Sequence, residues 1–306
     1  MAKQPPSTAR TPTRISAKKS LGQHFLHDRH VLERIAGAAN LSKTQGVLEI
    51  GPGTGALTRY LAKAAGRLVA VETDGRVMPL LQAEFAKSPH VTLLHADAMT
   101  LDWAGLQRDY FDGQPFALCA NLPYYITSPL IMAALEGGAE VDPIVVLVQR
   151  EVAERMAAKP GQAGYGLLSL AAQRYAAVEV CFGVAPGCFT PPPKVMSAVV
   201  RLRRKPDAPT REQSRAFFTL ARAAFAMRRK TLENNLISGL SLPREVVAQT
   251  LLGLGIDPKT RAEQLGEQAF LHMAQAFEGK MAQSTGNKPE ITGTGTRTDH
   301  RKGDQT

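Results

Sequence analysis

The feature that most limits the possible folds is an apolar run that leads directly into three closely spaced glycines. Val47–Ile50 is followed by Gly51-Pro52-Gly53-Thr54-Gly55, and Leu57 and Leu61 then fit one face of a helix. Glycine permits positive φ angles and lets a ligand approach bare backbone. We therefore predict a strand–turn–helix unit whose turn lies at the carboxyl end of the strand, where open α/β sheets bind ligands.

Short apolar runs alternate with helical patterns from Gly46 to about Arg203, which indicates a parallel sheet covered by helices. Only a proline-rich loop separates the last two runs. It leaves no room for a crossover helix, so we expect an antiparallel pair. The expected fold is α/β, with a doubly wound, mostly parallel seven-stranded sheet and one strand reversed near the edge. Its strands are expected at Gly46–Ile50, Leu68–Glu72, Val91–His95, Phe116–Ala120, Ile144–Gln149, Val178–Val184 and Ala198–Leu202.

Composition divides the chain into four parts. Residues 1–19 are rich in Pro, Thr, Ser, Lys and Arg and are expected to form a flexible basic arm. The sheet is expected over residues 20–206, with Arg203–Pro206 as a linker, and a small all-α domain over residues 207–282. Residues 283–306 are polar and low in complexity, and we expect a disordered tail.

The part beyond residue 206 has a helical pattern. Two of its helices are expected over Arg244–Leu254 and Gln264–Phe277. The residues that fit one face of an earlier helix are Phe218, Ala221, Phe225, Leu232 and Leu236.

The chain is basic, with 37 Lys and Arg residues against 27 Asp and Glu residues and a formal net charge of +10. This charge favours nucleic acid or an anionic membrane as a partner. The alternative is a basic protein without such a partner, and the net charge alone does not distinguish the two. No apolar run reaches membrane-spanning length, and no signal-peptide core follows the basic N-terminus. We therefore expect a cytoplasmic protein without membrane contact.

The chain has three cysteines, Cys119, Cys181 and Cys188, whose spacing matches no usual zinc site. Free thiols are the usual state in a reducing cytosol. We expect free thiols here and no bound metal.

The glycine spacing is Gly-x-Gly-x-Gly rather than the Gly-x-Gly-x-x-Gly of dinucleotide binders, whose pyrophosphate needs a helix N-terminus close by. A nucleoside ligand without phosphate, such as S-adenosylmethionine, fits the different loop. Glu49, just before the glycines, could hold the ammonium group of such a ligand through water. The alternative is a tight turn without a ligand, because a glycine turn alone is a weak signal.

Two carboxylates follow consecutive strands. Glu72 ends the second strand, about twenty residues past the glycines, where a carboxylate accepts from both ribose hydroxyls. Asp97 follows the third strand and can accept from an adenine amino group while the amide of Ala98 donates back. Either acid alone fits a helix N-cap equally well. Together, in register after two strands, they predict adenosine recognition.

The fourth strand ends in Asn121-Leu122-Pro123-Tyr124-Tyr125. The side-chain carbonyl of Asn121 and the backbone carbonyl of Leu122 can both accept from an exocyclic amino group. Pro123 restrains the turn, and Tyr124 offers a face on which a base can stack. The alternative is an ordinary proline turn with two core tyrosines.

Such a loop suits methyl transfer to adenine N6, a poor nucleophile because its lone pair is delocalised into the ring. Two acceptors on its hydrogens favour a tetrahedral nitrogen with a localised lone pair. A sulfonium methyl is already activated by its charge, so in-line transfer needs alignment more than a strong base. The same oxygens stabilise the positive charge that develops on the nitrogen.

The chain resembles the ribosomal RNA adenine dimethyltransferases, and within them the enzymes of the small subunit, over about residues 18–277. The resemblance implies a class I methyltransferase with a Rossmann-like fold that uses S-adenosylmethionine. It also implies N6-dimethylation of two adjacent adenosines in a hairpin near the 3′ end of 16S rRNA during ribosome biogenesis. The motifs that carry it are Lys19–Leu26, Gly51–Gly55, Asn121–Tyr125, Gln149–Arg155, Phe189–Val195 and Arg228–Leu232.

The resemblance also implies roles for individual residues. Phe189 would face Tyr124 as the second wall for a flipped base. His24 stands where asparagine is commoner, and either its side chain or its backbone would make the contact. The cofactor contacts are expected at His24, Leu26, Gly51, Gly53, Glu72, Asp97, Ala98 and Asn121.

Basic residues gather around the expected linker and the start of the helical part, and we expect RNA phosphates to bind there. The alternative is a solvated helix face. Arg222, Arg228, Arg229 and Lys230 are the main candidates. The wider group adds Arg201, Arg203, Arg204, Lys205, Arg211 and Arg215.

Three other functions remain open. A large-subunit rRNA adenine methylase, of the kind that confers macrolide resistance, would share the cofactor site. A non-catalytic assembly factor on the same scaffold would be expected to lose the glycines, the acids or Asn121, all of which are present. An NAD oxidoreductase is opposed by the glycine spacing. The expected partner is 16S rRNA in the small subunit or its precursor, bound by a monomer.

Overall fold

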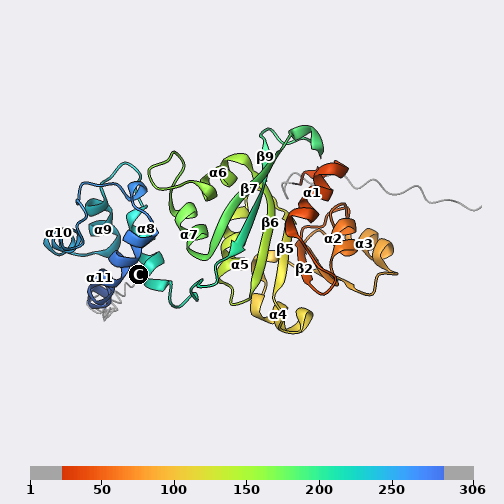
Figure 1. Ribbon diagram of the computed structural model, residues 1–306, viewed down its shortest axis with the longest axis horizontal. Helices are drawn as coiled ribbons and strands as arrows, with labels where there is room; N and C mark the ends of the chain where they lie inside the picture. The colour runs from red at the N-terminus through yellow and green to blue at the C-terminus, as the bar shows by residue number, and fades with distance from the viewer. Residues whose placement is uncertain (1–22, 286–306) are drawn as a thin grey trace, which may run out of the picture.

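The computed structural model describes residues 23–285 (Figure 1). The expected basic arm lies outside this part. Most of the expected C-terminal tail does too, but its first three residues belong to the last helix, α11 (Glu267–Thr285). Within the described part, no helix is both long enough and apolar enough to cross a membrane.

A seven-stranded sheet forms the centre of the molecule, as the strand pattern predicted. Its order is β4-β3-β2-β5-β6-β9-β7. The strand β9 runs antiparallel to both of its neighbours, so one strand is reversed next to the edge. The strands are β2 (Gly46–Ile50), β3 (Arg67–Glu72), β4 (Val91–His95), β5 (Phe116–Asn121), β6 (Val141–Gln149), β7 (Ala176–Val184) and β9 (Ser197–Arg204).

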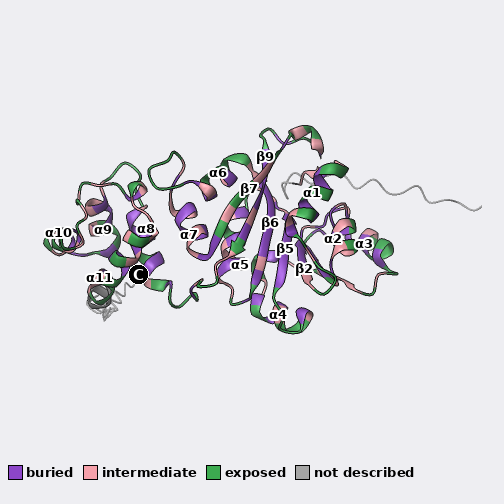
Figure 2. Ribbon diagram, viewed as in Figure 1, coloured by how far each residue is buried: buried purple, intermediate pink, exposed green. Residues whose placement is uncertain are grey.

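Helices cover both faces of this sheet, and Figure 2 shows its central strands, such as β5 and β6, largely buried between them. Successive side chains of a strand point to opposite faces. In β2, Leu48 and Ile50 therefore join a core with α4 (Trp103–Phe111), α5 (Thr127–Glu136), α6 (Arg150–Ala157) and α7 (Leu167–Tyr175). Val47 joins the opposite core, with α1 (Arg29–Ala39) and α2 (Thr58–Ala64). A third cluster lies around α3 (Met78–Phe85).

Four helices make up the C-terminal part: α8 (Arg215–Ala224), α9 (Leu232–Leu240), α10 (Arg244–Gly253) and α11. The expectation of one helix running through Phe218 and Leu236 is wrong, because residues 225–231 form a turn. Asn235 stabilises that turn. Its Nδ2 donates to the carbonyls of Ala224 and Met227 at 2.7 and 3.1 Å, and its Oδ1 accepts from the Met227 amide at 3.2 Å.

The expected linker is also wrong in its first half. Arg203 and Arg204 belong to β9 and pair with Ala177 and Ala176 of β7. The Lys205 amide then donates to the Tyr175 carbonyl at 2.9 Å. Strand pairing thus continues through Arg204, and only Lys205 and Pro206 of the expected linker lie outside the strand.

The helical part lies at one end of the molecule, beyond α7 (Figure 1). It shares a hydrophobic core with the sheet, since Tyr175 stacks on Phe218 with ring centroids 5.7 Å apart. Glu267 of α11 also accepts from Arg174 and Lys205, each at 3.0 Å. These contacts hold the helices against the sheet.

One carboxyl group is buried inside the sheet. The side chain of Glu49 is only 1% exposed, and its Oε2 has no hydrogen-bond partner among the described residues. Burial, with a smaller contribution from the nearby charge of Glu72, raises the pKa of Glu49 to about 8. The folded protein therefore keeps this carboxyl group protonated at neutral pH.

We expect the Glu49→Gln variant to gain stability relative to wild type as the pH rises from 5 to 8. The unfolded chain ionises Glu49 near its ordinary pKa of 4.5, whereas the folded protein retains the proton up to about 8. Wild-type stability should therefore fall, relative to the variant, by about 1.4 kcal/mol per pH unit across this window. Urea unfolding at pH 5, 6.5 and 8 measures the difference, and a pH-independent difference would contradict the raised pKa.

Candidate active site

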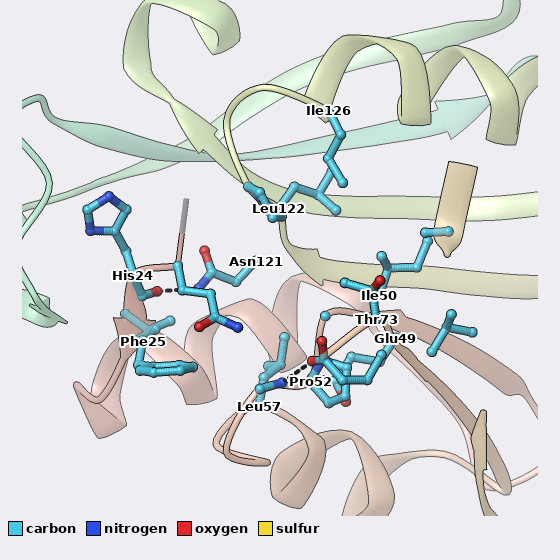
Figure 3. A pocket seen from close by; sticks show the side chains of 18 of the residues that line it. His24, Phe25, Glu49, Ile50, Pro52, Leu57, Thr73, Asn121, Leu122 and Ile126 are labelled. Carbon is cyan, nitrogen blue, oxygen red and sulfur yellow. Dashed lines mark hydrogen bonds between the residues drawn. The ribbon is translucent and has the colours of Figure 1, made fainter. Parts of the chain in front are cut away.

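A cavity of about 350 Å³ opens where β2, β3 and β5 end, and Figure 3 shows it from close by. The Asn121–Tyr125 loop forms one wall. All the residues expected to contact a cofactor line the cavity, namely His24, Leu26, Gly51, Gly53, Glu72, Asp97, Ala98 and Asn121. The sequence patterns therefore identified residues that the fold brings to one place.

The glycine turn has the backbone that its sequence predicted. Gly51, Gly53 and Gly55 have φ angles of 71°, 54° and 77°. A Cβ atom on Gly53 would come within 3.0 Å of the Phe25 ring. A side chain at this position would thus be strained and would crowd the cavity wall.

Glu72 ends β3 and lines the cavity while its carboxylate holds the neighbouring backbone. Its Oε2 accepts from the Gly53 amide at 3.0 Å, and its Oε1 accepts from the Asp74 amide at 2.8 Å. Each carboxylate oxygen can accept more than one hydrogen bond, so the group can still accept from ligand hydroxyls. The side chain reaches the cavity already oriented.

Asp97 makes the helix-cap contact that was the alternative to a ligand contact. Its Oδ1 accepts from the Met99 amide at 2.9 Å at the start of the 3₁₀ helix η2 (Ala98–Thr100). Its Oδ2 makes no hydrogen bond within the described residues. The two roles are compatible, because the cap orients one oxygen and leaves the other at the cavity.

The amide group of Asn121 is held by the N-terminal segment. Its Nδ2 donates to the backbone carbonyl of His24 at 3.1 Å, and Figure 3 shows the two residues joined beside the cavity. This bond uses the donor end of the amide, so Oδ1 remains as an acceptor. The turn that follows closes where the Ile126 amide donates to the Pro123 carbonyl at 3.2 Å. The Leu122 carbonyl makes no hydrogen bond within the described residues.

Tyr124 is positioned by contacts at both ends. Its hydroxyl lies 2.8 Å from Oγ of Ser197, and its ring stacks on that of His24 with centroids 5.9 Å apart. The Nδ1 of His24 lies 2.8 Å from the Pro191 carbonyl, which a protonated Nδ1 satisfies as donor. The side chain of His24 therefore supports Tyr124, and its backbone carbonyl orients Asn121.

The structure places Phe189 in the core rather than opposite Tyr124. This residue begins the short strand β8 (Phe189–Thr190), which pairs with β1 (Phe25–Leu26). Its side chain is only 3% exposed and packs in the cluster that contains Val199. It does not line the cavity. The prediction of Phe189 as a second wall is thus wrong for this arrangement, because the ring packs in the core instead of facing the cavity.

Other residues at the cavity were not singled out from the sequence. The Nε2 of Gln23 donates to Oδ2 of Asp74 at 3.1 Å, and Arg76 also donates to Asp74, which lowers the pKa of that carboxyl. Gln23 lies inside the motif Lys19–Leu26, so its place in that motif could have identified it from the sequence. Nothing in the sequence could have identified Ser197, because only the fold brings it to Tyr124.

The basic residues separate into two groups. In the first, Arg201, Arg203 and Lys205 form ion pairs with Glu179, Asp142 and Glu267, so they contribute to the fold. The second group is exposed and forms no ion pair with any described residue. It consists of Arg211, Arg215, Arg222, Arg228, Arg229 and Lys230. Arg204 belongs to neither group, because it is half-buried and donates to the Leu135 carbonyl. The second group is the better candidate for contact with phosphate.

The chain is similar to known proteins over most of its length. The family profile of ribosomal RNA adenine dimethylase matches residues 14–278. A protein of Lachnoclostridium phytofermentans named ribosomal RNA small subunit methyltransferase A is 42% identical over 272 residues, which cover 88% of this chain and 94% of that protein. Its namesake in Shouchella clausii is also 42% identical, over 87% of this chain and 95% of that protein.

Solved structures show the same similarity. A dimethyladenosine transferase from Plasmodium falciparum superposes with a TM-score of 0.71 at 26% identity, covering 84% of this chain and 98% of that one. The 23S rRNA methyltransferase ErmE gives a TM-score of 0.63 at 26% identity, with coverage of 83% and 99%. The chain therefore belongs to the ribosomal RNA adenine dimethylase family of methyltransferases.

Proposed function

We propose that this chain uses S-adenosylmethionine to dimethylate N6 of two adjacent adenosines in a hairpin near the 3′ end of 16S rRNA. The observation that carries the proposal is Asn121, whose Nδ2 is held by His24 so that Oδ1 is left to accept at the cavity. The matching relatives named for the small subunit support this choice of rRNA.

The cavity fits an adenosine-containing cation without phosphate. Its wall includes two buried carboxyl groups, Glu49 and Glu72, and Oε2 of Glu49 lacks a hydrogen-bond partner among the described residues. A cationic ligand beside Glu49 would favour the ionised form of this carboxyl group, which keeps its proton when no such charge is near. A bare glycine backbone forms another part of the wall. Glu72 and Asp97 would hold the ribose and the adenine, and Glu49 would face the ammonium group. When bound, the cofactor supplies a methyl group already activated by its sulfonium charge.

The chain's own residues then align the acceptor. In the first transfer, Oδ1 of Asn121 and the Leu122 carbonyl accept from the two N6 hydrogens, which localises the nitrogen lone pair. In the second transfer N6 carries a methyl group, and one of these oxygens accepts from the single hydrogen that remains. Tyr124, supported by His24 and Ser197, stacks on the base. The positive charge that develops on the nitrogen is stabilised by the same two oxygens. After each transfer the cationic nitrogen readily loses a proton to solvent water, so no histidine or carboxylate base is needed.

The expected setting follows from the same proposal. The partner is 16S rRNA within the small subunit or its precursor, and the enzyme acts in the cytoplasm as a monomer. Residues 1–19 would form a basic arm, residues 20–206 the catalytic domain and residues 207–282 an RNA-binding domain.

The direct test of the proposed reaction is transfer of tritiated methyl groups to undermethylated small subunits, followed by mass spectrometry of the RNA fragment. Binding without transfer would favour an assembly factor.

A large-subunit rRNA methylase is a second candidate, favoured by the superposition on ErmE. Primer extension on both rRNAs from a deletion strain separates the two. Loss of a large-subunit mark would reverse the choice of substrate.

The Asn121→Ala variant tests the proposed acceptor. We expect methyl transfer to fall on the order of 100-fold or more, because an oxygen that acts on the transition state is removed. Affinity for S-adenosylhomocysteine should change only a few-fold. Tritium transfer and isothermal titration measure the two quantities. An equal loss in both would show that Asn121 acts through cofactor binding instead.

The Glu72→Ala variant tests the ribose contact. We expect cofactor affinity to fall on the order of tenfold or more, because hydrogen bonds to a charged group are removed from a buried position. The rate at saturating cofactor should change much less. Glu154→Ala, which removes an exposed carboxylate paired with Arg150, is the control and should leave affinity unchanged. A loss of rate without a loss of affinity would contradict the assignment.

RNA affinity should fall steeply with salt, because basic side chains displace counterions from phosphates. Replacing Arg228, Arg229 and Lys230 together by serine should reduce the slope of log affinity against log salt by about 2, since each neutralised phosphate of single-stranded RNA contributes roughly 0.7. Lys87→Ser removes an exposed lysine elsewhere and serves as the control. Anisotropy titrations between about 50 and 300 mM salt measure the slope, and an unchanged slope in the triple variant would exclude this surface.

A further inference from the structure

Exposed apolar side chains lie at the cavity and next in sequence to Ser197, a residue that contacts the cavity wall. Met99 and Tyr125 line the cavity, and Val195 and Met196 directly precede Ser197, the residue that contacts Tyr124. All four belong to the small set of large hydrophobic side chains that the described part leaves exposed. Single apolar residues at a surface need no explanation, but Met99 and Tyr125 share one opening, which indicates a binding surface.

Tyr125 is the most exposed of the four, at 63%. It follows Tyr124 in the turn between β5 and α5. Tyr124 is held by Ser197 and by the ring of His24. In contrast, the hydroxyl of Tyr125 makes no hydrogen bond within the described residues. One tyrosine therefore forms the wall of the cavity, and the next offers a free aromatic face at its mouth.

The proposed reaction brings a particular group to this place. The two target adenosines are adjacent, so the sugar–phosphate link holds one base at the mouth while the other is in the cavity. The base left outside loses its stacking partner when the target base leaves the stack. An aromatic side chain restores such stacking, and every base has a face that it can use.

We propose that Tyr125 is a stacking platform for the nucleobase next to the target adenosine, so that it positions one adenosine while the other is being methylated. This inference rests on the proposed function and extends it to a residue outside the cofactor and acceptor contacts. The ring alone accounts for the effect, because stacking needs no hydroxyl.

The test is a cycle that combines protein variants with RNA lacking one base. The probe is an RNA hairpin with two adjacent loop adenosines, compared with two versions that carry an abasic site at either position. Anisotropy titrations with saturating S-adenosylhomocysteine measure binding without reaction. Wild type should bind at least one abasic RNA on the order of tenfold more weakly than the intact hairpin. Tyr125→Ala should bind the intact hairpin equally weakly and show no further loss on that abasic RNA.

Two variants control the cycle. Tyr125→Phe retains the ring and should behave as wild type. Leu252→Ala removes a side chain that is also 63% exposed, but in α10 rather than at the cavity, and it should behave as wild type. The proposal is overturned if wild type binds both abasic RNAs as tightly as the intact hairpin, if Tyr125→Ala still distinguishes the intact hairpin from every abasic RNA that wild type binds more weakly, or if Tyr125→Phe loses the distinction. Methyl transfer to the intact hairpin by wild type tests the proposed function separately, since the binding cycle involves no transfer.

Discussion

Burial of both faces of a parallel sheet is the constraint on which the rest of this structure depends. In β2 and β5, alternate side chains enter opposite cores, and their register pairs Ile50 with Ala120. A shift by one residue would exchange those faces, so the register is strongly specified. Parallel strands held in this register end at the same edge. For that reason the glycine turn, Glu72 and Asn121 lie around one cavity.

The N-terminal segment completes that cavity from a distance in sequence. The strand β1 pairs with β8, and His24 contacts both Asn121 and Pro191. Ordering such a segment lowers conformational entropy on folding, and these hydrogen bonds offset the loss. As a result Oδ1 of Asn121 and the ring of Tyr124 are held in place by the fold itself, which the proposed methyl transfer requires of its aligning groups.

The sequence predicted some features well because their signals are local. Apolar runs gave the strands to within a few residues, since their period and bounding turn residues lie in the run itself. The break between α8 and α9 was missed because the hydrophobic period continues across it, while the deciding contact is made by the side chain of Asn235. Arg203 looked like part of a linker by composition, but strand pairing with β7 decided its place.

By itself, the sequence determined where the seven strands lie along the chain, the positive φ angles at the glycines and the residues expected to contact a cofactor at the cavity. Each of these follows from side-chain chemistry or from spacing along the chain. Only the tertiary structure decided that Phe189 is buried, that His24 supports Tyr124, and which basic residues remain free of ion pairs within the described part. Those outcomes depend on which distant segments come together, and a single segment carries no information about its partner.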